Sequence, residues 1–423
     1  MTRRRLAAVG ATAVSVAMLG MSAGAGVASA HHARRAGATI TLQFWNAYNT
    51  TDAEASTMAK IVIPKFEAEH PGIKVVSDVY PYGELLSKIV ASAAAGNPPD
   101  VVRSDIIWVP QLAKQGVLLP LSKSMPAFAK LSKSVYPGSL STNYYKGAYY
   151  GLPLDTNTQV LFWNKADFQA AGIKTPPTTL TQIFQDAVKL TNPAKKQYGL
   201  DVQGTDMWSV DPLIWSGGGS ITNSTFTKAE GYLNSPRTIS ILTDIYHLLK
   251  SGDVNPDILG GTGTVGGESA FPKGISAMYL DGPWGSAFYQ SSFPKLQYGM
   301  QVLPHSVVGG EDVVIPAGTK HAAAAEAFVQ FLLSPWAQNE MAKAGQMSVL
   351  KSAGASETKI QAYYAPFAKQ LLTAEARIPS PAYNQIDTAF SNDLEAALHG
   401  KMSVSAAMNQ AAQQAQTLLD QNG

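Results

Sequence analysis

The sequence contains no cysteine among its 423 residues. This excludes disulfide bonds, zinc sites with cysteine ligands, a cysteine nucleophile and a lipid anchor on cysteine. Charged residues are also few, at 15% of the chain, and 32 basic residues nearly balance 30 acidic ones. A near-neutral chain lacks the basic surface that is typical of proteins that bind nucleic acid or anionic membranes.

The first 30 residues have the features of a secretory signal peptide. Three arginines at residues 3–5 precede an apolar stretch of small residues, which ends in the cleavage pattern Ala28-Ser29-Ala30. The arginines also resemble a twin-arginine export motif. Removing residues 1–30 takes away three arginines and no acid, so the formal net charge changes from +2 to −1. We expect an exported protein, periplasmic or extracellular, with a disordered leader at residues 31–38.

After the signal sequence the chain has no long apolar run of the kind that spans a membrane. The remaining 393 residues exceed the usual size of a single hydrophobic core, which predicts two lobes.

Hydrophobic periodicity predicts strands that alternate with helices. The alternation begins with a strand at 39–44, a helix at 52–69, a strand at 73–76, a helix at 85–95 and a strand at 100–102. The pattern starts afresh after residue 150, and further helices are expected at 179–190, 235–249, 334–344 and, as a pair divided near residues 399–400, 382–419. This order is typical of βαβ units with parallel strands, so the expected fold class is α/β.

Several blocks, in this order, resemble the family 1 extracellular solute-binding proteins of ABC importers. Together they cover residues 39–423, and the matching blocks are LQFW at 42–45, FEAEHPGIKV at 66–75, AGNPPDV at 95–101, YGLP at 150–153, FWNK at 162–165, AMYLDGPW at 277–284, YGMQVLP at 298–304 and AEAFVQF at 325–331.

The resemblance implies a two-lobed clamp in which each lobe is a mainly parallel sheet flanked by helices. The chain would cross between the lobes three times, near residues 150–154, 300–304 and 347–352. The implied N-terminal lobe combines residues 39–150 and 303–348, and the implied C-terminal lobe combines residues 153–300 and 350–423. A small-molecule sugar would be bound between them and delivered to the membrane permease subunits of an ABC importer by a monomeric, soluble protein.

A sugar presents apolar C–H faces and a rim of hydroxyls, so its site needs aromatic side chains together with carboxylates and amides. In an open α/β sheet such residues follow the carboxyl ends of strands. Trp45, Asn46 and Tyr48 follow the first strand, and Ser104 and Asp105 follow a later one. Asp105 can alternatively cap the next helix.

Asp155 and Asn157 lie just beyond the extended segment at residues 152–154. The resemblance puts Asn157 where sugar-binding relatives have a glutamate, so Asp155 is expected to supply the acceptor charge, with a hinge role as the alternative. Asp206 and Trp208 occupy a loop in which the family places sugar contacts.

Trp284 follows a Gly-Pro turn after a buried strand, and the turn is expected to bring the indole to the rim of the cleft, where the family stacks a sugar ring. Glu311 follows Gly309 and Gly310, which allow close approach of a ligand. Arg377 occupies a position at which the family commonly has a polar residue of the cleft. If it faces the ligand, an anionic ligand becomes more plausible.

Two other classes of function remain open. The first is a clamp for another polar solute, such as a glycerol phosphate or a polyamine. The second is a secreted carbohydrate-active enzyme, in which Asp105 and Asp155 could act as the carboxyl pair of a glycosidase. The sequence contains no GxSxG or HExxH motif and no histidine cluster with metal-ligand spacing, so we expect no enzyme, metal or cofactor.

Overall fold

The computed structural model describes residues 39–50, 53–261, 265–353 and 357–422. Among these residues the largest sheet has seven strands in the order β11-β6-β10-β3-β1-β2, with β12 paired to β10. Its strands are β1 (Ile40–Asn46), β2 (Ile73–Val79), β3 (Val101–Asp105), β6 (Gly151–Thr158), β10 (Ser306–Val314), β11 (Met347–Ser348) and β12 (Ala374–Glu375). β1 is parallel to β2 and β3, as predicted, whereas β10 runs antiparallel to β3 and β6.

A second sheet has three strands in the described part of the chain, β7 (Val160–Asn164) between β8 (Met278–Asp281) and β9 (Tyr298–Gln301). Both pairings are antiparallel, and parallel pairing here is limited to isolated bridges such as that between Leu200 and Val254. The expected parallel pairing is therefore found among β1, β2 and β3, whereas the three strands of the second sheet pair antiparallel. A small hairpin joins β4 (Tyr144–Tyr145) and β5 (Ala148–Tyr149).

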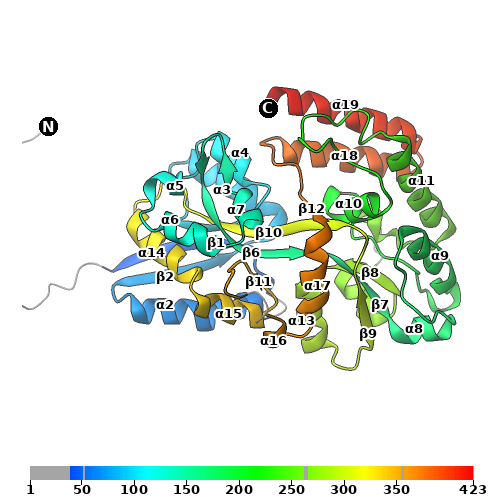
Figure 1. The fold of residues 1–423 in the computed structure, drawn as a ribbon, viewed down its shortest axis with the longest axis horizontal. Helices are drawn as coiled ribbons and strands as arrows, with labels where there is room; N and C mark the ends of the chain where they lie inside the picture. The colour runs from blue at the N-terminus through cyan, green and yellow to red at the C-terminus, as the bar shows by residue number, and fades with distance from the viewer. Residues whose placement is uncertain (1–38, 51–52, 262–264, 354–356, 423) are drawn as a thin grey trace, which may run out of the picture. The chain divides into compact units, whose positions relative to one another are not determined.

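Helices cover both sheets (Figure 1). Around the first sheet they are α1 (Glu54–Thr57), a π-helical turn (Met58–Val62), α2 (Ile63–Glu69), α3 (Tyr82–Ala94), α4 (Val109–Lys114), α5 (Leu121–Ser124), α6 (Phe128–Ser134), α7 (Pro137–Ser141), α14 (Ala322–Leu332) and α15 (Pro335–Lys343). The others are α8 (Lys165–Ala170), α9 (Leu180–Leu190), α10 (Met207–Ser216), α11 (Pro236–Ser251), α12 (Gly267–Ala270), α13 (Pro283–Ser292), α16 (Glu357–Ile360), α17 (Tyr364–Gln370), α18 (Tyr383–Leu398) and α19 (Val404–Asn422), with 3₁₀ turns at Pro193–Lys195, Pro256–Leu259, Phe271–Lys273 and Leu371–Thr373.

Local sequence explains the helix boundaries. In α11 the Ser235 side chain accepts a hydrogen bond from the backbone N–H of Thr238, and Pro236 occupies the first turn. Gly252 ends the helix with φ of 82°, a left-handed conformation that glycine adopts without strain. Ser334 caps α15 in the same way, so both predicted Ser-Pro helix starts are confirmed.

Three expected loops belong instead to strands. β1 continues to Asn46, β6 continues to Thr158, and β10 already includes Gly309 and Glu311. Polar residues in β6 and β10 take part in the backbone pairing, because β10 lies between β3 and β6 and pairs with both, with one register shift between Glu311 and Asp312. As a result, residues expected in loops, such as Trp45, Asp155 and Glu311, lie in strands, where alternation sets the direction of each side chain.

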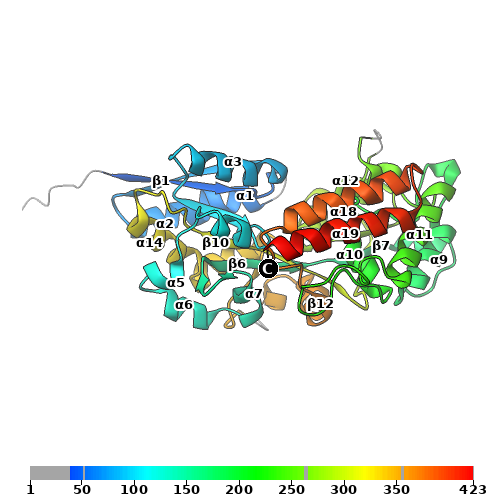
Figure 2. The same ribbon diagram turned by 90° about the horizontal axis from the view of Figure 1, so that it is seen from above.

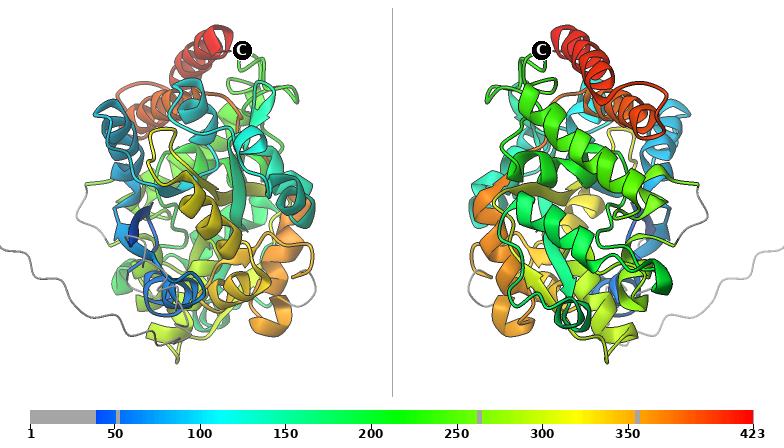
Figure 3. Two further views of the ribbon diagram at one scale, coloured as in Figure 1. Left: turned by 90° about the vertical axis from the view of Figure 1, so that its left-hand side faces the viewer. Right: turned by 90° about the vertical axis from the view of Figure 1, so that its right-hand side faces the viewer.

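The buried hydrophobic residues form three clusters, and the smallest of them lies around the second sheet, with Val160, Phe162 and Tyr279. Another contains β1 and β10 residues packed against α2 and α14, with Phe44, Phe66 and Phe328 at its centre. The largest lies among α9, α10, α11, α18 and α19 and continues to α3, α4 and β3 beside the first sheet. Figure 2 shows α18 and α19 side by side. In the right-hand view of Figure 3 the green helices, which include α9 and α11, face the viewer. β6 leads directly into β7, so the two sheets meet where β6 ends and the antiparallel β10 begins.

Candidate functional site

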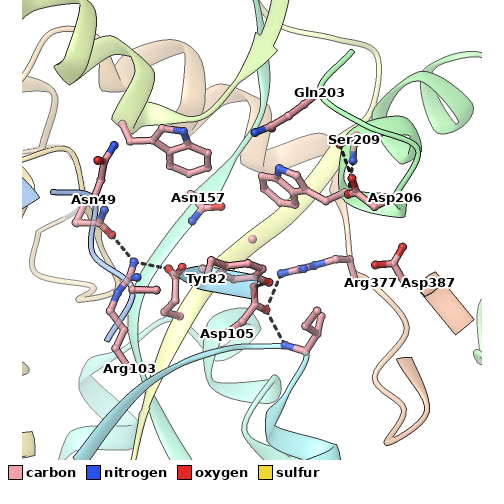
Figure 4. A pocket seen from close by; sticks show the side chains of 18 of the residues that line it. Asn49, Tyr82, Arg103, Asp105, Asn157, Gln203, Asp206, Ser209, Arg377 and Asp387 are labelled. Carbon is pink, nitrogen blue, oxygen red and sulfur yellow. Dashed lines mark hydrogen bonds and ion pairs between the residues drawn. The ribbon is translucent and has the colours of Figure 1, made fainter. Parts of the chain in front are cut away.

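A cavity of about 550 Å³ lies where the two sheets meet. Its wall is built from segments far apart in the sequence and combines aromatic, amide and charged side chains (Figure 4). The lining residues are Ala47, Asn49, Glu54, Tyr82, Arg103, Asp105, Ile107, Asn157, Gln203, Asp206, Trp208, Ser209, Glu268, Trp284, Gly309, Gly310, Glu311, Gln346, Arg377, Tyr383 and Asp387.

Two tryptophans form an aromatic surface in this wall. Trp284 is the second residue of α13 and Trp208 the second residue of α10, and their ring centroids lie 6.3 Å apart at an interplanar angle of 31°. Both indoles lie close against glycine backbone. A Cβ at Gly282 would come within 2.3 Å of the Trp284 ring, and one at Gly309 within 2.7 Å of the Trp208 ring. The glycines therefore allow the two indoles to lie flat in the cavity wall.

Arg103 of β3 forms a closely paired cluster at one side of the cavity. Its guanidinium lies 3.2 Å from Asp155 Oδ2 and 2.7 Å from Glu311 Oε2, and it donates to Gln346 Oε1 at 3.0 Å. It also lies 4.4 Å from the centroid of the Tyr48 ring. Burial and the neighbouring Asp155 carboxylate raise the pKa of Glu311 well above its usual range, although Arg103 acts in the opposite direction.

Arg377 and Asp105 form a second ion pair on the other side of the cavity. An Nη atom of Arg377 lies 3.1 Å from Asp105 Oδ1, and Tyr82 donates its hydroxyl to Asp105 Oδ2 at 2.7 Å. Asp105 Oδ1 also accepts the backbone N–H of Ile107. The Arg377 guanidinium lies 5.3 Å from the centroid of the Trp208 ring, which is a cation–π distance.

The structure brings seven of the predicted site residues to the cavity, and they are Asp105, Asn157, Asp206, Trp208, Trp284, Glu311 and Arg377. Asp206 also caps α10 through the backbone N–H of Ser209. Asp105 lies in the cavity wall, but the alternative that it caps the next helix is wrong, because α4 begins at Val109 after Trp108 and Asp105 accepts instead the backbone N–H of Ile107.

Five predicted residues lie outside the cavity lining, namely Trp45, Asn46, Tyr48, Ser104 and Asp155. The Asn46 side chain is buried and donates to Ser77 Oγ, and Trp45, its neighbour in β1, packs on Tyr80. We expected the first strand to end before Trp45, whereas β1 continues to Asn46. The alternation of the strand therefore sets the directions of both side chains, and neither lines the cavity.

The other three are buried behind the cavity wall. Tyr48 is 3% exposed and is covered by Arg103, while Asp155 is 4% exposed and pairs with the same guanidinium. Ser104 is fully buried and donates its hydroxyl to the Asp105 carbonyl oxygen. These residues support the lining residues and do not face the cavity themselves.

Several lining residues were not predicted, including Arg103, Tyr82, Gln203, Glu268, Gln346 and Asp387. Arg103 directly precedes Ser104 and Asp105 at the carboxyl end of a strand, so the rule that selected those two could have found it. Tyr82, Gln346 and Asp387 come from distant segments with no local signal.

Among the described residues no group of three or more His, Asp or Glu side chains is arranged to hold a metal ion. The described part of the chain also contains no helix that is both long and apolar enough to cross a membrane. The predicted signal sequence at 1–30 and leader at 31–38 lie outside the described residues.

Comparison with known proteins places the chain in a family. The family model of the bacterial extracellular solute-binding proteins matches residues 49–339. The chain is 27% identical over 320 residues to a multiple sugar-binding protein of Streptococcus mutans, covering 69% of this chain and 71% of that protein. It is 24% identical to a galactooligosaccharide-binding protein of Bacillus subtilis, covering 86% and 87%.

A solved structure shows the same fold. A solute-binding protein of an ABC transporter from Thermotoga lettingae, bound with α-D-tagatose, superposes with a TM-score of 0.80 at 23% identity, over 90% of this chain and all of that one. The predicted two-lobed α/β fold is thereby confirmed. The chain belongs to the family of bacterial extracellular solute-binding proteins, as its resemblance to family 1 of the ABC importers predicted.

Proposed function

We propose that this protein captures a mono- or oligosaccharide in the cavity between its lobes and delivers it to the permease subunits of an ABC importer. The observation that carries the proposal is the pair of indoles, Trp208 and Trp284, in the wall of a polar cavity. Aromatic faces suit the C–H faces of a sugar ring, and the nearby amides of Asn157 and Gln203 suit its hydroxyls.

The same proposal includes the lobe boundaries and the site of action. The lobes would comprise residues 39–150 with 303–348, and 153–300 with 350–423. The pairing of β6 with both β10 and β11 supports crossings near these positions. The exported protein would act as a monomer in the periplasm or outside the cell, without a lipid anchor because it has no cysteine.

The charges of the cavity disfavour an anionic ligand such as a glycerol phosphate. Arg377, which could have bound an anion, already pairs with Asp105, and Arg103 pairs with Asp155 and Glu311. Neither guanidinium offers a free positive charge to a phosphate, which usually needs one. The two relatives named above are described as binding proteins for sugars, which agrees with the proposal.

The carboxyls considered for glycoside hydrolysis do not support an enzyme. Asp155 lies outside the cavity lining, and both oxygens of Asp105 already accept hydrogen bonds. A glycosidase needs two carboxyls that reach the same glycosidic bond. We therefore propose binding without chemistry.

The test is calorimetric titration of a panel of mono- to oligosaccharides into the wild type and Trp284→Ala. We expect at least tenfold weaker binding by the variant, about 1.4 kcal/mol, with little change in stability because Trp284 is only half-buried in the wall. Trp336→Ala, an exposed tryptophan on α15, is the matched control and should retain the wild-type affinity. A large loss of stability with intact affinity would make Trp284 a core residue and remove the main support for the proposal.

A further inference from the structure

The cavity lining carries more acid than base. Only two of its side chains are basic, Arg103 and Arg377, and its carboxyl groups are those of Glu54, Asp105, Asp206, Glu268, Glu311 and Asp387. Each guanidinium is already matched, Arg103 by Asp155 and Glu311 and Arg377 by Asp105. Beyond these pairs the lining also contains the carboxyl groups of Asp206 and Asp387, which add negative charge.

Asp206 and Asp387 lie near Trp208 together with Asp211, which does not line this cavity and whose pKa is raised well above its usual range by burial; we call these three aspartates the acidic wall. Asp387 Oδ1 accepts the backbone N–H of Met207 at 2.7 Å, which places the α18 carboxylate next to Asp206 at the start of α10. Figure 4 shows Asp206 and Asp387 on the same side of the cavity as Arg377. Among the described residues, no salt bridge joins any of the three to a basic side chain.

A second observation in the same place also points to a ligand. Asp211 Oδ1, the Tyr383 hydroxyl and Arg377 Nε have no hydrogen-bond partner among the described residues, although these side chains are only 2%, 1% and 7% exposed. All three residues line a further cavity of about 470 Å³, and Arg377 and Tyr383 line both cavities. Buried polar groups without partners are costly, so this wall is suited to a polar ligand.

The aromatic rings of Trp208 and Tyr383, beside the acidic wall, lie close to a positively charged side chain of the protein itself. One guanidinium, that of Arg377, lies 5.3 Å from the Trp208 centroid and 5.9 Å from the Tyr383 centroid. Electron-rich faces beside carboxylates are the chemistry that binds organic ammonium groups. A neutral hydroxyl would satisfy the hydrogen bonds here but would bring no positive charge to Asp206 and Asp387.

We propose that the sugar captured by this protein carries a protonated amine, which the acidic wall binds beside Trp208. The inference rests on the proposed sugar-binding function and specifies its substrate class as amino sugars. Charge-assisted hydrogen bonds from the ammonium group to Asp206 and Asp387 would favour an amino sugar over its neutral parent. N-acetylation removes the charge, and a uronic acid brings a like charge to the wall.

The experiment compares matched sugars by calorimetry at pH 7 and low salt. The probes are glucose, galactose, mannose and cellobiose, their 2-amino analogues (glucosamine, galactosamine, mannosamine and the diamino disaccharide), the N-acetylated forms, and glucuronic acid. We expect at least one amino sugar to bind tenfold or more tightly than its neutral parent. We also expect the preference to shrink severalfold between 50 and 500 mM salt, because salt screens the charges.

Two results separate the inference from the function on which it rests. If neutral sugars bind and every amino analogue binds as weakly as its parent or more weakly, the inference is overturned and the proposed function remains. If no sugar of the panel binds, the proposed function itself fails, and the inference fails with it.

Variants of the acidic wall locate the effect. Asp206→Asn keeps a residue that caps helices well, and Asp387→Asn keeps an oxygen that can accept the N–H of Met207. Each should lower the ratio of amino-sugar to neutral-sugar affinity at least fivefold, and the ratio within one variant does not depend on how much of the protein is folded. Glu69→Gln, which removes a surface charge on α2, should leave the ratio unchanged. An unchanged ratio in both aspartate variants would overturn the assignment.

Discussion

The two arginines of the cavity, Arg103 and Arg377, are equally buried but differ in how fully they are paired. Arg103 contacts two carboxylates and the Gln346 amide, and its charge is held within the wall. Arg377 contacts one carboxylate, its Nε has no partner, and it lies against Trp208. We therefore expect the Arg103 side of the cavity to support the fold, and we propose that the Arg377 side binds the ligand.

The largest effect is expected from Arg103→Met. Removing the guanidinium leaves Asp155 and Glu311 buried without their counter-charge, which should lower the free energy of unfolding by about 3–5 kcal/mol. Urea denaturation measures this loss. Lys74→Met is the matched control, because the ion pair of Lys74 with Glu67 is at the surface and should contribute less than about 1 kcal/mol. Equal losses in the two variants would show that the Arg103 cluster is not structural.

The pH dependence of the free energy of unfolding should reveal the negative charge of Asp387, on the Arg377 side of the cavity. Burial raises the pKa of Asp387 to about 6, whereas an unfolded aspartate titrates near pH 4. As the pH rises from about 4 to about 6, the unfolded chain loses this proton first, so stability falls across that window. The contribution is fully present below about pH 4, and up to about 3 kcal/mol of it is lost above pH 6.

Asp387→Asn should make this decrease less steep, because the variant has no carboxyl proton to lose at position 387, whereas Asp201 and Glu357, with pKa values raised to about 6 and about 7, still contribute. The groups that face Asp387 are Asp206, Asp211, Asp105, Arg377 and Tyr383, and all of them remain in the variant. Urea denaturation of the ligand-free protein at several pH values measures the slope, and Asp420→Asn at the exposed end of α19 serves as the control. A slope as steep as that of the wild type would contradict the account of Asp387.

The smallest effect is expected from Tyr82→Phe. The variant loses only the hydroxyl that donates to Asp105 Oδ2, while Arg377 and the backbone N–H of Ile107 still bind the other oxygen of that carboxylate. Thermal unfolding should show a loss of about 1 kcal/mol or less. A loss as large as that of Arg103→Met would mean that the two sides of the cavity are equally structural.

The sequence predicted the elements of the fold well where local signals are strong. The Ser-Pro helix starts at Ser235 and Ser334 and the glycine stop at Gly252 act within a few residues, so they can be seen in the sequence. Trp284 was found in the same way, from the strand and turn that precede it. The two-lobed arrangement came from the resemblance to a family, because no local pattern encodes which strands cross between lobes.

The site was predicted less completely, for two physical reasons. Strand ends cannot be located to one residue, and in β1 an error of two residues decided whether Trp45 and Asn46 face the cavity. The pairing of Arg103 with Glu311, and that of Arg377 with Asp105, joins residues more than 200 positions apart. Such pairs depend on the tertiary fold, and the sequence carries no local signal for them.

The central claim is that the cavity binds a sugar and leaves it unchanged. The most direct measurement is to incubate the pure protein with each sugar of the panel, record its melting temperature, and identify the sugar recovered afterwards. The account predicts that at least one sugar raises the melting temperature in a concentration-dependent way and is recovered intact. Hydrolysis products, or a melting temperature that no sugar changes, would contradict it.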